Sequence, residues 1–300
     1  MSATIAARDL RKRYGEVRAV DGVSFEVEEG EFFGILGPNG AGKTTTLEII
    51  EGLREADSGE VTVLGMAPWP RNPKLLPRIG VQLQATSFFE RLTAREQIRT
   101  FASLYGVGPA RADEMLDVVG LADKADTRTE QLSGGQMQRL SIASALVHGP
   151  DLVFMDEPTA ALDPQARRNL WDLLREINTA GRTIVLTTHY MDEAETLCDR
   201  VAIMDRGKIL ECGPPATLAR GLNSLIRISV EHGLLSEADA RTLPGAEDVT
   251  DDGVSLTIGT HDAAPVLAGL AQRNALRGLS VRGATLEDVF LKLTGREYRA

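Results

Sequence analysis

One stretch of the chain has the residue types and the spacing that bind a polyphosphate. It reads Gly37-Pro38-Asn39-Gly40-Ala41-Gly42-Lys43-Thr44 and fits the pattern G-x-x-x-x-G-K-[ST]. Glycines let backbone N–H groups turn inward around phosphate oxygens, and a helix that starts there adds positive potential. Lys43 would reach the outer phosphates, and the Thr44 hydroxyl would hold Mg²⁺. A plain glycine-rich turn is the alternative, but the strand-like segment 31–36 and the helix-like segment 44–50 favour the phosphate loop.

Two carboxylates end a second apolar segment, residues 151–156. Ligands bind beyond the carboxyl ends of parallel strands, so Asp156 is expected to bind Mg²⁺ from the side opposite Thr44. Glu157 would accept a proton from an attacking water. Two solvated loop acids are the alternative, and the Lys43-Thr44 pair disfavours it.

Three other features have chemical interpretations beside ordinary structural ones. His189 ends the apolar strand predicted at 183–188, where a structural and a catalytic role are equally expected. Gly134 and Gly135 are poor helix formers, which suits either bare backbone facing a ligand or a simple helix entry. Tyr14 could stack on an adenine ring, although its spacing alone favours a half-exposed strand aromatic.

The candidate site residues described above can meet at one place only if an α/β core with parallel strands positions them. Residues 4–36 alternate with period two, which predicts a small antiparallel sheet beside that core. A capping box at Thr93 and Glu96 opens a helical insertion at about 85–145. Asp163-Pro164 predicts the start of a helix over 165–179.

The character of the chain changes after residue 220. Strands are predicted at 226–230 and 254–258, and helices at 234–243 and 263–273, which makes a small α+β accessory domain at 221–300. The last helix is expected to be capped at Thr285, with Asp288 at N3. The helix has an apolar stripe that consists of Leu286, Val289, Phe290 and Leu293. This stripe is expected to pack on the sheet of its own domain, and the alternative is that it packs on the same domain of a partner chain.

Length, charge and composition indicate the class of protein. The 300 residues suggest two domains, here 1–220 and 221–300. A net charge of −10 argues against nucleic acid as the main partner. The chain has no run of 18 apolar residues that could span a membrane and no apolar N-terminal core of a signal peptide. Cys198 and Cys212 form neither a metal cluster nor a disulfide framework, so a cytoplasmic protein is expected.

The order of these motifs over residues 1 to about 220 resembles that of the ATP-binding subunits of ABC transporters. The resemblance rests on the phosphate loop, Gln84, Leu132 to Gln136, Asp156-Glu157, Ala161-Leu162-Asp163 and His189. The tail at 284–295 resembles the C-terminal region of exporters of the daunorubicin-resistance and sodium-efflux type.

The resemblance implies a role for each position. Glu157, His189, Gln84 and Lys43 would form the catalytic set, with Gln82 as second choice for the glutamine. Thr44, Gln84 and Asp156 would hold Mg²⁺. Ser133 and Gly135 would contact ATP bound by a second subunit, and Asp163 would communicate across the dimer. The nucleotide would be contacted by Tyr14, Gly37, Pro38, Asn39, Gly40, Ala41, Gly42, Lys43, Thr44, Thr45, Ser133, Gly134, Gly135, Gln136 and Asp163.

The function implied is that of an ATP hydrolase that dimerises around ATP and drives a separate polytopic membrane permease, exporting a drug or toxin. Such a subunit would lie at the inner face of the cell membrane through that permease. Phe88-Phe89 could mark the surface that binds it, unless both rings lie in the core of the insertion. Alternatives are a non-transport ABC ATPase acting on ribosomes or DNA, and a scaffold that no longer hydrolyses ATP.

Overall fold

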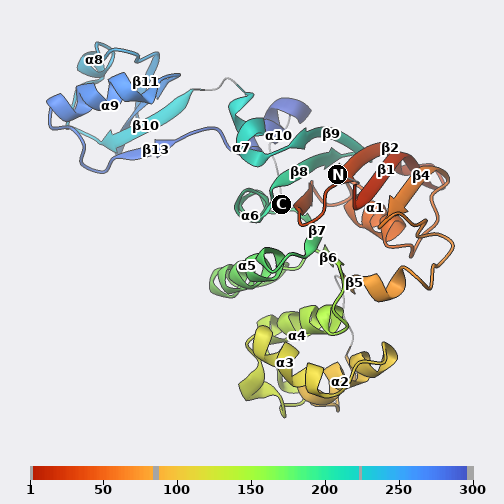
Figure 1. The fold of residues 1–300 in the computed structure, drawn as a ribbon. Helices are drawn as coiled ribbons and strands as arrows, with labels where there is room; N and C mark the ends of the chain where they lie inside the picture. Colours follow the sequence, from red (N-terminus) through yellow and green to blue (C-terminus); the bar gives the residue numbers. More distant parts are fainter. Residues whose placement is uncertain (1–2, 84–87, 223–224, 296–300) are drawn as a thin grey trace. The chain divides into compact units, whose positions relative to one another are not determined.

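The computed structural model describes residues 3–83, 88–222 and 225–295. The chain forms two compact units that divide between Pro215 and Ala216 (Figure 1). Each unit has its own sheets and its own apolar core. Within the described ranges, no helix has the length and apolar character needed to cross a membrane.

A six-stranded sheet forms the centre of the first unit, with strands in the order β5-β6-β7-β3-β8-β9. The first five are parallel and β9 pairs antiparallel with β8. β3, β6 and β7 are buried along their whole length, as apolar strands covered on both faces are. The strands are β3 (Phe32–Leu36), β5 (Ile79–Gln82), β6 (Leu152–Asp156), β7 (Thr183–Thr188), β8 (Arg200–Asp205) and β9 (Lys208–Gly213).

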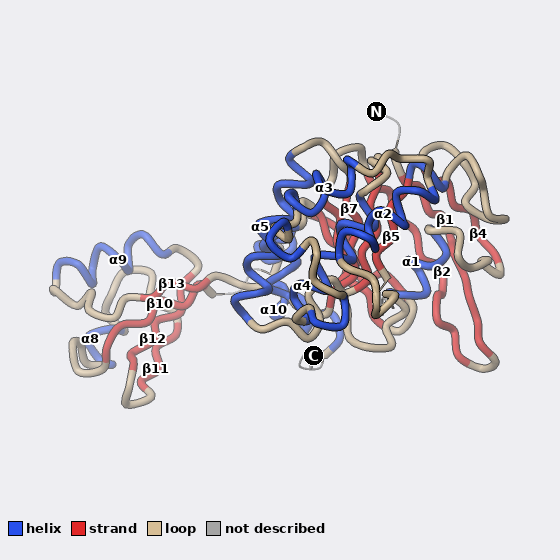
Figure 2. The backbone as a smooth tube through the Cα atoms, turned by 90° about the horizontal axis from the view of Figure 1, so that it is seen from below, coloured by secondary structure: helices blue, strands red, loops and turns tan. Residues whose placement is uncertain are grey.

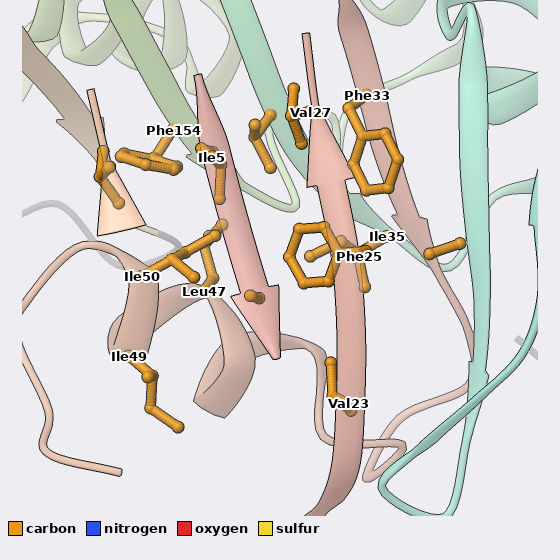
Figure 3. Packing of buried hydrophobic residues seen from close by; sticks show 14 of the residues in the cluster. Ile5, Val23, Phe25, Val27, Phe33, Ile35, Leu47, Ile49, Ile50 and Phe154 are labelled. Carbon is orange, nitrogen blue, oxygen red and sulfur yellow. The ribbon is translucent and has the colours of Figure 1, made fainter. Parts of the chain in front are cut away.

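The antiparallel sheet predicted for the N-terminal segment is confirmed. It has the order β2-β1-β4 and consists of β1 (Ile5–Tyr14), β2 (Val17–Val27) and β4 (Ser58–Val63). Its apolar face shares one core with the parallel sheet and helix α1 (Lys43–Ile50), as Figure 3 shows. Phe25 and Phe33 stack there with ring centroids 5.3 Å apart. This shared core fixes the hairpin β1–β2 beside the loop that follows β3.

Helices make up the insertion between β5 and β6. The capping box predicted at Thr93 and Glu96 opens α2. Helix α4 begins at Gly134, because Ser133 caps it and the Gln136 side chain completes the capping box. Asp163 caps α5 as predicted. The insertion contains α2 (Ala94–Leu104), α3 (Ala110–Val118) and α4 (Gly134–Leu146), with short 3₁₀ turns at Ala122–Lys124 and Thr129–Gln131. Outside the insertion, a 3₁₀ turn at Leu76–Arg78 precedes β5, α5 (Pro164–Thr179) follows β6, and α6 (Met191–Leu197) follows β7.

The second unit is a four-stranded antiparallel sheet in the order β11-β12-β10-β13, with helices on its apolar face (Figure 2). After α7 (Pro215–Arg220), the order β-α-β-β-α-β is that of ferredoxin-like domains. The elements are β10 (Ile226–Glu231), α8 (Glu237–Ala240), β11 (Asp248–Asp251), β12 (Ser255–Thr260), α9 (Ala263–Gln272), β13 (Ser280–Arg282) and α10 (Leu286–Thr294).

Three features of this unit differ from the expectation. Only four residues of the helix predicted at 234–243 are helical, because Ser236 caps its start at Glu237. β11 and β13 were not anticipated, since they are short and largely exposed. Helix α10 has the predicted cap, and three of its four stripe residues are buried, yet they lie outside the apolar cluster over the sheet. The favoured packing of that stripe on its own sheet is therefore not what the fold shows.

Gly80 allows the insertion to pack on the parallel sheet. A Cβ built there would lie 2.2 Å from the backbone oxygen of Ala145 in α4. We expect Gly80→Ala to lower the free energy of unfolding by about 1–3 kcal/mol, the usual range for overpacking a core. Gly108→Ala is the control, because a Cβ there meets open space. Urea denaturation of both variants measures the difference, and equal stabilities would show that α4 can move away at no cost.

Candidate functional site

The site is built at one edge of the parallel sheet. β7 lies between β6 and β3, so the carboxyl ends of these three strands are neighbours. Asp156 pairs in register with Thr187, and Leu36 with Thr188. The loop after β3, the acids at the end of β6 and the histidine after β7 therefore meet at one place, which is where parallel sheets bind ligands.

The loop after β3 has backbone positions that only glycine can occupy. A Cβ at Gly37 would lie 2.2 Å from the backbone oxygen of Met204. Gly42 has a φ of 101°, and its Cβ would lie 2.1 Å from the backbone oxygen of Ala19. Both glycines are thus required by close backbone contacts and, at Gly42, by left-handed backbone.

Helix α1 starts from this loop with its amide groups free for a ligand. Among the described residues, no side chain caps it at Gly42, and no acid lies in its first turn. The first N–H groups of a helix have no partner within the helix, and they carry partial positive charge. An anion placed in the loop would satisfy both conditions.

The side chain of Lys43 is buried within the loop. Only 4% of its side chain is exposed, and its ammonium forms an ion pair with Glu157 Oε1 at 3.1 Å. It also donates to the backbone oxygens of Gly37 at 2.9 Å and Pro38 at 3.2 Å. The charge that would meet a phosphate is therefore held by a carboxylate and two carbonyl groups.

The side chains of Thr44 and Asp156 face each other. Thr44 Oγ1 donates toward the two carboxylate oxygens of Asp156, at 3.1 and 3.3 Å. Burial raises the pKa of Asp156, and the hydrogen bonds from Thr187 and Thr44 oppose that rise. No cluster of three His, Cys, Asp or Glu side chains suited to a metal exists in the described ranges. One carboxylate with one hydroxyl nevertheless fits Mg²⁺, which takes few protein oxygens and completes its shell with phosphates and water.

Glu157 joins three parts of the site. Its Oε1 contacts Lys43, and its Oε2 lies 3.0 Å from His189 Nδ1. Its φ of 47° is left-handed, a conformation that a glutamate adopts only when its surroundings fix it. The fixing partner is Thr187, whose hydroxyl accepts from the Glu157 amide at 3.0 Å.

Thr187 is a site residue that the sequence reasoning missed. Its hydroxyl donates to the Asp156 carboxylate as well as accepting from Glu157 N. The available signal was a hydroxyl residue near the carboxyl end of the strand predicted at 183–188, but threonine is common in strands.

The sequence offers two candidate glutamines, Gln84 and Gln82. Gln84 lies outside the described residues. Gln82 is buried at the end of β5, where its Nε2 donates to the backbone oxygen of Leu83 at 2.6 Å. Its Oε1 has no hydrogen-bond partner in the described part of the chain. Tyr14 is 42% exposed at the end of β1, a position that suits either of its two interpretations.

The segment from Ser133 to Gln136 forms a separate group. The Ser133 side chain accepts from Gln136 N at 3.3 Å, and the Gln136 side chain accepts from Ser133 N at 2.9 Å. No contact recorded for the described residues joins this segment to the loop of Lys43. Asp163 likewise serves its own helix, accepting from Gln165 N and Ala166 N, each at 2.9 Å.

Comparison with known proteins agrees with this geometry. Residues 20–160 match the family described as ABC transporter, and residues 240–295 match the C-terminal domain of the nodulation factor export protein NodI. The chain is 40% identical to Nod factor export ATP-binding protein I of Cupriavidus metallidurans, over the full length of both proteins. It is 38% identical to linearmycin resistance ATP-binding protein LnrL of Bacillus subtilis, over 98% of this chain and 99% of the relative.

Solved structures share the architecture of the first unit. An ATP-binding cassette of an ABC transporter in its ADP conformation aligns with a TM-score of 0.65 and 26% identity, covering 71% of this chain and 92% of that one. The protein cbiO1 of Clostridium perfringens aligns with a TM-score of 0.67 and 28% identity, covering 74% and 95%. The chain therefore belongs to the ATP-binding subunits of ABC transporters, which are ATPases that work with membrane permease partners.

Proposed function

We propose that this subunit dimerises around ATP and Mg²⁺ and uses hydrolysis to drive export of a drug or toxin through a separate permease. The observation that carries the catalytic part is the position of Glu157, between the loop lysine and His189 and one residue after Asp156. A carboxylate held in this way is suited to take a proton from an attacking water.

ATP binding would free that carboxylate. The outer phosphates compete with Glu157 for the ammonium of Lys43, which lies 3.1 Å from Glu157 Oε1. Once Lys43 has turned to the phosphates, one oxygen of Glu157 can accept a hydrogen bond from water. His189 keeps the other oxygen oriented, at 3.0 Å, and stands ready to contact the γ-phosphate. The base is thus exposed only when substrate occupies the loop.

Mg²⁺ would be held by the Thr44 hydroxyl, the Asp156 carboxylate and Gln84. The ion supplies neutralisation of charge on the phosphate oxygens when it is bound. The short link between Thr44 and Asp156 supports this assignment, because it already brings two hard oxygen ligands together.

The need for a second subunit is supported by Gly134. A Cβ at this position would meet nothing within 4 Å, and its φ is not positive, so the chain's own packing does not require glycine there. A glycine at an exposed helix start suits the close approach of a ligand from outside the chain. We assign that ligand as ATP bound by the partner subunit, contacted by Ser133 and Gly135, with Asp163 at the dimer interface.

The permease and the cargo are proposed from the relatives. One relative is named for the export of Nod factor and another for resistance to linearmycin. Both names suit a transporter that moves compounds out of the cell, which places this subunit at the inner face of the membrane through its permease. We propose residues 1–220 as the ATP-binding domain and 221–300 as an accessory domain without chemistry of its own.

We expect Glu157→Gln to lower ATP turnover by about 10² or more, the scale for losing a positioned base. Glutamine keeps the shape and one hydrogen-bond acceptor, so the variant should still bind ATP and accumulate as a dimer. Phosphate release and gel filtration with ATP measure the two properties. Glu60→Gln, on the exposed surface of β4, is the control. Turnover within about twofold of wild type would remove Glu157 from the base role.

Phe89 tests the permease surface. Its side chain is 64% exposed, which rules out the alternative that both rings lie in the core of the insertion, while Phe88 is half-buried. We expect Phe89→Ser to abolish coupled transport and to leave basal ATP hydrolysis unchanged, because the ring contacts a partner rather than the fold. Val118→Ser removes another exposed apolar side chain of the insertion and should leave transport intact. Normal transport by Phe89→Ser would place the permease elsewhere.

Truncation after Gly221 tests the division of roles. The catalytic residues all precede it, and the second unit has its own core. We expect the shortened chain to bind ATP and to retain measurable hydrolysis, while dimer lifetime or coupling to the permease changes. Nucleotide binding and circular dichroism are the measurements. A truncated chain that is folded but cannot bind ATP would falsify the separation of roles.

A further inference from the structure

Tyr14 ends β1, and one face of its ring is covered by Arg54. The neighbouring strand β2 lies against the loop, since a Cβ on Gly42 would lie 2.1 Å from the Ala19 backbone oxygen. The guanidinium carbon of Arg54 lies over the Tyr14 ring, 5.3 Å from its centroid. This distance is within the range of cation–π attraction.

Arg54 is itself fixed to the helix that starts at the loop. Its Nε donates to Glu48 Oε2 at 2.6 Å, and its backbone N–H donates to the Glu48 backbone oxygen at 3.1 Å. Glu48 belongs to α1, whose first residue is Lys43. A chain of contacts from Glu48 through Arg54 to Tyr14 therefore ties the orientation of the ring to the phosphate-binding helix.

We infer that Arg54 is a positioning residue for the purine base: it holds one face of the Tyr14 ring so that the other face stacks on the base. The inference rests on the adenine-stacking role that the proposed function gives Tyr14. A half-exposed tyrosine loses rotamer freedom when it stacks, and a restraint present before binding removes that cost. Stacking needs a planar cation, which arginine provides and lysine does not.

A direct role of Arg54 on the phosphates is a weaker interpretation of the same contacts. Its Nε already donates to Glu48 Oε2 at 2.6 Å, so this donor is not available to a phosphate. Lys43 and the start of α1 supply the positive potential of the loop instead. Arg54 therefore acts on the ligand through the ring of Tyr14.

The test compares two ligands that differ in the base. Binding of ATP and of inorganic tripolyphosphate is measured by calorimetry for wild type, Arg54→Ala, Arg54→Lys and Tyr14→Ala. Arg8→Ala is the control, since Arg8 lies on the same strand and pairs only weakly, at 3.8 Å, with Glu26. We expect Arg54→Ala to weaken ATP binding about fivefold, and Arg54→Lys to recover only part of this loss. Tripolyphosphate binding should not change, and in turnover KM should rise while kcat stays constant.

The double variant gives a second readout. If Arg54 acts through the ring, adding Arg54→Ala to Tyr14→Ala should cause no further loss of ATP affinity. An equal loss of ATP and tripolyphosphate affinity would mean that Arg54 supports α1, and tighter ATP binding would mean that it covers the face the base needs. Either result overturns the inference. Unchanged ATP affinity in Tyr14→Ala would instead remove the stacking role of Tyr14, and this inference with it.

Discussion

The site depends on the buried ion pair between Lys43 and Glu157. It joins a loop after β3 to the end of β6, two strands that are separated in the sheet by β7. Both side chains are almost fully buried, so each charge is compensated by the other when no nucleotide is present. A phosphate that reaches the loop would therefore replace Glu157 as the partner of Lys43 rather than meet an unpaired ammonium.

The sheet order explains why these residues meet. β3, β6 and β7 are far apart in sequence, but they are consecutive in the parallel sheet. All three strands are buried along their whole length, and their central residues are apolar. The polar residues that form the site, Asp156 and Thr187, lie at the carboxyl ends of β6 and β7. The chemistry is thus confined to one edge by the same burial that stabilises the core.

Much of this could be predicted from the sequence because the signals were local. Three signals each determine the local backbone geometry within a few residues: the glycine pattern before Lys43, the helix cap at Asp163 and the capping box at Thr93. Features that depend on contacts distant in sequence could not be predicted. Thr187 resembles any strand threonine until β7 is paired with β6. The short strand β13 becomes a strand only through its pairing with β10, and the stripe of α10 gave no indication of which surface buries it.

The close backbone contacts at Gly37 and Gly42 also limit how the binding site can vary. A methyl group at either position would collide with a carbonyl oxygen that belongs to another strand. Even the smallest substitution at these two positions therefore disrupts the phosphate-binding loop. Nucleotide affinity can therefore be tuned only by residues around the loop, whose side chains can change in size or polarity without blocking it. In this fold the backbone of the anion-binding loop is fixed, and sequence variation is tolerated in the residues that surround it.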